Sequence, residues 1–315
     1  MSKKKDMRFP FVFCLIFFIA CNQEPVLTKV MPLPDYPSGS AIAHFKKNIY
    51  LMGDDAPYLL VIDTGFRSID TIQFFSSADK RIPKDVKKDP EAITNIEYEN
   101  NPALLLLGSG SLPTRNICWI IIPTSKQKIT ISLDTFYRRL QQMGIKEINI
   151  EGAATTPSGI VLACRGNKAF AKNYLIFTSH NFWHNQQEAN IQLATLGVQS
   201  DTSNFVGVSG LEYSKLHDQL LITLSTENTY DAYTDGVIGK SFLWQVNDIS
   251  LKHTYSGINP NKTFDLEAID GRFKKQKIES VCILAENASR QELLLVADDD
   301  KGGSVLFQLT LPRKP

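Results

Sequence analysis

Short apolar runs separated by polar turns recur along the whole chain, and they predict β-strands almost everywhere. The runs are rich in Val, Ile, Leu, Thr and aromatic side chains, the residue types that fit a pleated sheet. One segment, Thr135–Met143 with Gly144 directly behind it, has the apolar spacing and the terminal glycine of a helix. The pattern therefore predicts an all-β protein with one surface helix between its repeats.

A four-residue signal opens each of five units along the chain. Its second residue is always Ser or Glu, and its third is always Ala, Gly or Ser. The third positions lie 51, 60, 58 and 70 residues apart, and each interval is long enough for a four-stranded propeller blade. The five signals are Gly39–Ile42, Pro90–Ile93, Ile150–Ala153, Val208–Leu211 and Ile278–Val281.

The strands that follow these signals predict a five-bladed β-propeller. Four units have room for four strands, whereas the fifth ends near Leu311 after three. The lone segment Val26–Met31 is expected to supply the missing strand, which closes the ring and protects the sheet edges. The outer strand of the fourth unit is expected at Ile249–Tyr255. Because Phe264–Gly271 resembles a further start signal, a degenerate sixth blade is the alternative.

The N-terminus has the pattern of a bacterial lipoprotein signal. Basic residues precede an apolar run from Phe9 to Ala20 that is short for a membrane span. A small residue then precedes Cys21, as in the lipobox, where the cysteine becomes the lipidated first residue of the mature protein. We expect residues 1–20 to be a signal peptide, residues 21–25 a lipidated tether, and residues 26–315 a single propeller domain. An uncleaved membrane anchor is the alternative.

Cleavage after residue 20 leaves a chain with the composition of a secreted globular protein. It retains 30 basic and 32 acidic residues, a net charge of −2, so we expect no binding of nucleic acid. Residue 22 is Asn rather than the Asp that favours inner-membrane retention, which points to the outer membrane of a Gram-negative envelope. Three cysteines remain, an odd number in apolar runs, and they are expected to be buried free thiols. They are Cys118, Cys164 and Cys282.

The second position of the start signal is the main candidate for chemistry. The first strand of each propeller blade lines the central channel, so these residues should meet at one end of it. Glu91, Glu151 and Glu279 hold the position in three units, whereas Ser40 and Ser209 hold it in the other two. Converging carboxylates must raise their pKa values, pair with cations or bind a metal. Ca²⁺ is the natural ion, because it prefers oxygen ligands.

Charged loops between second and third strands should lie at the same end of the channel. Asp298 and Asp299 follow the second strand of the fifth unit. Basic residues in the second and third units suit an anionic substrate. They are Arg115, Arg165 and Lys168. The alternative is that the glutamates are hydrated or pair with these arginines. The stretch Lys80–Asp89 is expected to be a solvated loop.

Two of the units resemble those of phytase-like and SdiA-regulated propellers. They are Ile150–Ala153 with Val161–Gly166, and Ile278–Val281 with Leu293–Asp300. As a whole, the chain resembles an uncharacterised group of lipid-anchored propellers. In the better-known relatives axial carboxylates hold Ca²⁺ and some members hydrolyse esters or phosphoesters, so the resemblance implies a metal-ligand role for the three glutamates. The two serines at the same position depart from that pattern.

The sequence leaves two functions open. The first is a non-catalytic binding or scaffold lipoprotein that presents a propeller face to a protein, a glycan or a small anionic ligand. The second is a Ca²⁺-dependent hydrolase of anionic esters, which needs Glu91, Glu151 and Glu279 close to one common point. The sequence contains neither a G-x-S-x-G elbow nor an H-E-x-x-H motif, so it favours the first.

Overall fold

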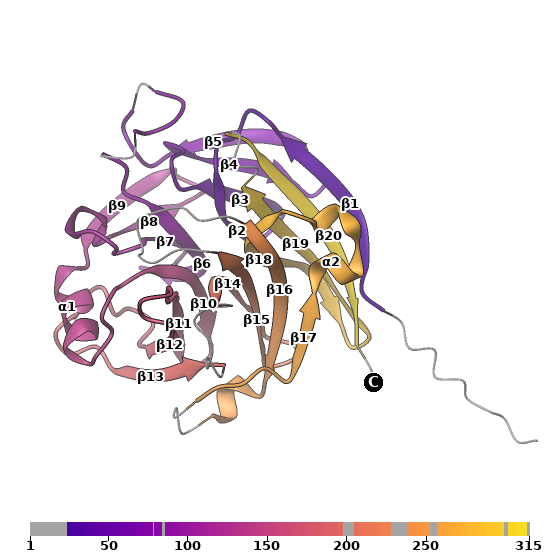
Figure 1. Cartoon of the computed structure of the whole chain (residues 1–315). Coiled ribbons are helices and arrows are strands. Elements are labelled where there is room, and N and C mark those ends of the chain that lie inside the picture. The colour runs from indigo at the N-terminus through magenta and orange to yellow at the C-terminus, as the bar shows by residue number, and fades with distance from the viewer. Residues whose placement is uncertain are drawn as a thin grey trace, which may run out of the picture.

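Five four-stranded antiparallel sheets form a ring around a common axis (Figure 1). The structure, a computed structural model, describes residues 24–77, 79–83, 86–197, 205–227, 238–252, 257–298 and 302–313. The first strands of neighbouring sheets contact one another around the axis, and the later strands of each sheet lie progressively farther out. The predicted five-bladed β-propeller is therefore confirmed.

The blades follow one another in chain order. Blade one contains β2 (Gly39–Phe45), β3 (Asn48–Gly53), β4 (Tyr58–Asp63) and β5 (Ser68–Gln73). Blade two contains β6 (Pro90–Tyr98), β7 (Asn101–Gly108), β8 (Ile117–Ile122) and β9 (Gln127–Ser132). Blade three contains β10 (Ile150–Thr156), β11 (Gly159–Cys164), β12 (Asn173–Thr178) and β13 (Ile191–Leu196). Blade four contains β14 (Val206–Ser214), β15 (Gln219–Glu227), β16 (Ile238–Asn247) and β17 (Lys262–Asp265).

Blade five combines the two ends of the chain, as the sequence predicts. It contains β18 (Lys277–Asn287), β19 (Arg290–Asp298), β20 (Ser304–Pro312) and, as its outer strand, β1 (Val26–Leu33). The register pairs Val26 with Thr310 and Leu33 with Ser304 in antiparallel orientation. The ring is thus closed by a strand from the N-terminal end of the chain.

The hydrophobic core lies between the blades. Each of five apolar clusters joins the facing sides of two neighbouring sheets, and the last joins blade five to blade one. Because most strands are covered on both faces, they appear in the sequence as continuous apolar runs rather than alternating ones. Cys118, Cys164 and Cys282 are buried free thiols, as predicted.

The outer strand of blade four is not where the sequence places it. Within the expected segment, Ile249–Leu251 is a short 3₁₀-helix, and β17 supplies the outer strand instead. The carboxylate of Asp218 accepts hydrogen bonds from the N–H and hydroxyl of Ser250, which holds this segment in a turn. The supposed sixth start signal is β17 followed by the short helix α2 (Leu266–Ile269), so the alternative of a sixth blade is wrong.

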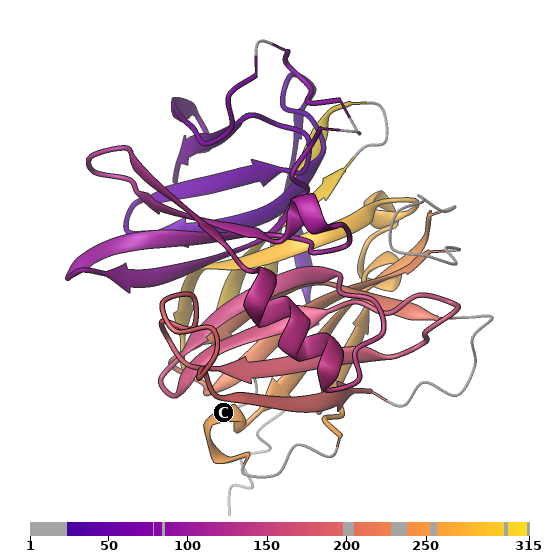
Figure 2. The same cartoon turned by 90° about the vertical axis from the view of Figure 1, so that its left-hand side faces the viewer.

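The predicted surface helix is present as α1 (Asp134–Gln142), which connects blade two to blade three. It lies at the periphery of the ring (Figure 2). Its side chains Phe136, Tyr137 and Leu140 are buried in the core between blades two and three. In the part of the chain that the structure describes, no helix is long and apolar enough to cross a bilayer. Shorter 3₁₀-helices occupy Pro113–Arg115 and Gly271–Phe273.

Candidate functional site

A β-bulge occurs at the second residue of the start signal in all five blades. In every pairing of a first with a second strand, the register skips this one residue. A bulge leaves the extra residue outside the ladder and re-aims its side chain. The bulged residues are Ser40, Glu91, Glu151, Ser209 and Glu279. We call them the bulge ring.

The two serines of the bulge ring connect neighbouring blades. Ser40 Oγ donates a hydrogen bond of 2.8 Å to the carbonyl of Pro90, and Ser209 Oγ donates one of 2.6 Å to the carbonyl of Ile278. Both acceptors directly precede the bulged glutamate of the next blade. The serine positions are therefore structural ties between blades, and both side chains are buried.

The three glutamates have different surroundings. Burial, followed by the nearby Asp89, Glu151 and Asp54, raises the pKa of Glu91 well above its ordinary value. Glu151 Oε1 accepts a hydrogen bond of 2.7 Å from Asn149. Glu279 forms an ion pair of 3.1 Å with Lys277 on its own strand. The expectation that these three glutamates share one metal ion stays a prediction.

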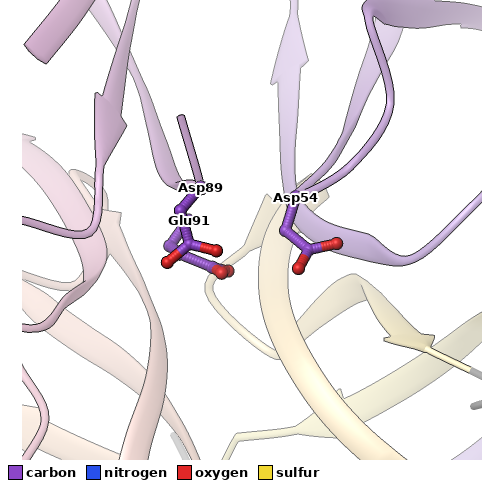
Figure 3. Close-up of side chains that lie close together, drawn as sticks. All are labelled: Asp54, Asp89 and Glu91. Carbon is purple, nitrogen blue, oxygen red and sulfur yellow. The ribbon is translucent and has the colours of Figure 1, made fainter. Parts of the chain in front are cut away.

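An acidic triad, Asp54, Asp89 and Glu91, lies at the boundary between blades one and two. Its carboxylate oxygens lie within 4.8 Å of one another, and among the described residues this is the group whose side chains could hold a metal ion. Figure 3 shows Asp89 and Glu91 facing Asp54 across the boundary. Glu91 is the member that the sequence predicted as a metal ligand, whereas Glu151 and Glu279 lie outside this group.

Two cations already engage the triad. Lys87 Nζ contacts the carboxylate of Asp54 and lies 2.9 Å from Asp89 Oδ1, while Arg115 Nη1 lies 2.6 Å from Asp89 Oδ2. The side chains of Lys87 and Arg115 are only 12% and 2% exposed. Burial alone lowers the pKa of Lys87, but Asp54, Asp89 and Glu91 outweigh it and raise that pKa. The two cations balance the charges of Asp54 and Asp89, and the raised pKa of Glu91 favours its neutral form.

The covered side chains of Lys87 and Asp89 contradict part of the expectation of a solvated loop over Lys80–Asp89. Lys80 and Arg81 are exposed, whereas residues 84 and 85 lie outside the described residues. The loop folds back on blade one, because Arg81 Nε donates a hydrogen bond of 2.7 Å to Asp55 and the N–H of Ile82 donates one of 2.7 Å to the Asp55 carbonyl. The feature of the sequence that could have predicted the burial of Asp89 is its position immediately before a start signal.

The other predicted site residues are spread around the ring. Arg165 is buried, and its Nη2 lies 3.4 Å from Ser225 Oγ of blade four. Lys168 is partly exposed in the loop between β11 and β12, and Asp298 ends β19 opposite Ser304. Cys21 and Asp299 lie outside the described residues. The roles assigned to these residues stay predictions.

Comparison with known proteins identifies a family and a fold. The model of a family of unknown function (DUF6929) matches residues 35–311. No curated protein matches the chain. The structure is similar to the major allergen Mala s 1 of Malassezia sympodialis, with 11% identity over 90% of this chain and 96% of that one and a TM-score of 0.52. It is also similar to glutaminyl cyclase of Myxococcus xanthus, with 8% identity over 92% of this chain and 97% of that one and a TM-score of 0.49. These likenesses concern the fold alone.

Proposed function

The chain belongs to this family of unknown function, a membership that assigns no activity, and we propose that it is a non-catalytic binding protein of the cell envelope. The face that carries the bulge ring binds a small polar ligand. The observation that supports this proposal is the mutual neutralisation of charge at the boundary between blades one and two.

A self-neutralised cluster is suited to structure rather than to reaction. Ion pairs that are buried or partly buried link Asp54, Lys87, Asp89 and Arg115 in a continuous chain that joins two blades. Removing one partner from such a pair leaves an uncompensated buried charge. Catalytic metal sites keep one coordination position open toward the substrate, whereas Lys87 bridges two of the three carboxylates here. The cluster therefore supports a rigid, preorganised binding face.

A second candidate function is a Ca²⁺-dependent hydrolase of anionic esters or phosphoesters, phytase-like or lactonase-like. The observation that favours it is the acidic triad of Asp54, Asp89 and Glu91. Hard carboxylate oxygens are the ligands that Ca²⁺ prefers, and a bound ion would polarise an ester or phosphate. In this candidate Arg115 assists with an anionic substrate, and Lys87 has to leave the triad because its charge repels the ion.

One substrate, p-nitrophenyl phosphate, separates these two functions. The purified chain is mixed with p-nitrophenyl phosphate in the presence of Ca²⁺ or a chelator. Binding of p-nitrophenyl phosphate and release of p-nitrophenol are both measured. A binding protein gives no release, and its melting temperature is the same with Ca²⁺ and with the chelator. Ca²⁺-dependent release that is lost in Glu91→Gln, but kept in the exposed same-strand control Glu97→Gln, would overturn the proposal in favour of the hydrolase.

We further propose that Cys21 carries the lipid that holds the chain at the outer membrane. The support is the lipobox pattern and the Asn that follows the cysteine. Mass spectrometry should find the mature chain beginning at an acylated Cys21, and fractionation should place it with the outer membrane. The Cys21→Ser variant should leave the outer-membrane fraction. A variant that stays membrane-bound would indicate an uncleaved N-terminal anchor instead.

A further inference from the structure

A cavity of about 410 Å³ lies on blade three, and neither the bulge ring nor the acidic triad contributes to its lining. One wall is the segment that joins α1 to β10, and the other is the loop between β11 and β12 together with the start of β12. Its lining runs from the buried Ile145 and Cys164 to the exposed Lys146 and Phe170. This volume falls within the usual range of small-molecule sites.

A buried amide joins the two walls of this cavity. The side-chain oxygen of Asn167 accepts hydrogen bonds of 2.9 Å from the N–H groups of both Ala169 and Phe170. Its Nδ2 donates a bond of 2.6 Å to Glu147 Oε2 on the opposite wall. Asn167 is only 4% exposed, while the Phe170 ring that it positions is 43% exposed. The loop is therefore held in one shape by specific bonds and presents an aromatic ring to the cavity.

The charge around the cavity is unbalanced. Its lining includes the cations Lys146, Arg165 and Lys172, but one carboxylate, Glu147, which already accepts from Asn167. Arg165 is buried and bonded to Ser225 of blade four, so the excess rests on Lys146 and Lys172 against Glu147, a net charge of +1. Lys146 and Lys172 are both exposed. A partly enclosed space with excess positive charge favours an anion.

We infer that this cavity binds a small organic anion. Its carboxylate or phosphate group lies near Lys146 and Lys172, and its flat apolar part packs against Phe170 and Tyr174. The inference deepens the proposed function, on which it rests, because it names the class of ligand. Binding is non-covalent, since burial raises the pKa of the only lining thiol, Cys164, to about 12 and so keeps it protonated.

Calorimetric titration of the purified full chain tests the inference with four probes. Phenyl phosphate and benzoate carry both parts of the expected ligand, whereas benzyl alcohol lacks the charge and benzylamine reverses it. We expect saturable binding of the two anions and none of the other two. The double variant Lys146→Ala with Lys172→Ala should weaken anion binding about ten-fold or more, because charge-assisted contacts are lost.

A matched double variant keeps the test specific. Lys47→Ala with Lys215→Ala removes the same charge from exposed turns between first and second strands, at the opposite end of the ring. It should bind both anions like the wild type. Equal weakening in the two double variants would overturn the assignment to this cavity, and absence of anion binding in the wild type would overturn the ligand class. Neither outcome depends on the turnover of p-nitrophenyl phosphate, by which the proposed function itself is judged.

Discussion

The boundary between blades one and two and the cavity on blade three share one face of the ring, yet they hold charge in opposite ways. At the boundary every carboxylate of the Asp54 and Asp89 pair has a cation within contact distance. At the cavity Lys146 and Lys172 line an open volume with one carboxylate, which is bonded to an amide. The boundary has the denser cluster of charged side chains, but these side chains are paired with one another and so are less available to a ligand than those at the cavity. A binding site is indicated here by unbalanced charge beside a cavity, rather than by the number of charged residues.

The largest effect is expected from removing Asp89, the central carboxylate of the boundary. Asp89→Asn leaves Lys87 and Arg115 partly unpaired in a buried site, and we expect the free energy of unfolding to fall by about 3–5 kcal/mol. Urea denaturation measures it. The control is Asp70→Asn, which breaks an exposed pair with Lys126 and should leave stability almost unchanged. Equal, small losses in both variants would show that the boundary is not a structural cluster.

The second test uses pH. Burial and then Asp89, Glu151 and Asp54 raise the pKa of Glu91 above its ordinary value of 4.5, so the folded state holds this proton more tightly than the unfolded state. Its contribution to stability is fully present below the unfolded pKa and is lost as pH rises toward the folded pKa. Relative to Glu91→Gln, the wild type should therefore lose unfolding free energy as the pH rises above the ordinary Glu pKa of 4.5 toward the raised pKa of the folded state. Parallel pH curves for the two proteins would contradict the shift.

A third, smaller effect links the cavity to blade four. A Cβ at Gly207 would lie 2.4 Å from Nε of Arg165, whose side chain is buried and has to move. Gly207→Ala should therefore lower unfolding free energy by about 1–3 kcal/mol and weaken anion binding in the cavity. The control is Gly271→Ala, because a Cβ there meets no atom within 4 Å. A Gly207→Ala protein with wild-type stability and affinity would show that Arg165 is not fixed by this contact.

The smallest effect on stability is expected at the aromatic ring of the cavity. Phe170→Ala removes an exposed side chain, so the unfolding free energy should stay within about 0.5 kcal/mol of the wild type. Binding of phenyl phosphate should nevertheless weaken, whereas binding of inorganic phosphate should not. Leu216→Ala, which truncates another exposed apolar side chain, should change neither quantity. A large loss of stability in Phe170→Ala would assign the ring to the core instead.

The repeat along the sequence predicted the fold because it follows directly from packing around the axis. The third residue of each start signal is small because neighbouring first strands contact each other there. A Cβ on Gly210 would lie 2.7 Å from the Cα of Ser280 in the next blade. Likewise, a Cβ on Gly152 would lie 3.0 Å from the carbonyl carbon of Gly210. The second residue lies at the bulge, outside the strand ladder, so this limit on size does not apply to it and it can be Ser or Glu. Local constraints of this kind remain visible in a single sequence.

The candidate site was only partly predictable, because its contacts join segments distant in the chain. Glu91 was identified from its repeat position, but Lys87 reaches the triad only because a polar loop folds back over blade one. The composition of that loop is the same whether it is solvated or folded back. The cavity was missed for a similar reason, since the hydrogen bond between Asn167 and Glu147 spans 20 residues and has no periodic pattern.

The closing strand has a consequence for the order of events in folding. Thr28 of β1 donates a hydrogen bond to the carbonyl of Gln308 in β20, across a separation of 280 residues. Pairing over such a distance is slow and requires the last strand to have been synthesised. Until β1 pairs with β20, blade five has an uncovered edge along β20. Unpaired edges of this kind promote association between chains that have not finished folding. The slowest step of maturation is thus expected to be the meeting of the first strand with the last, after the individual blades have formed.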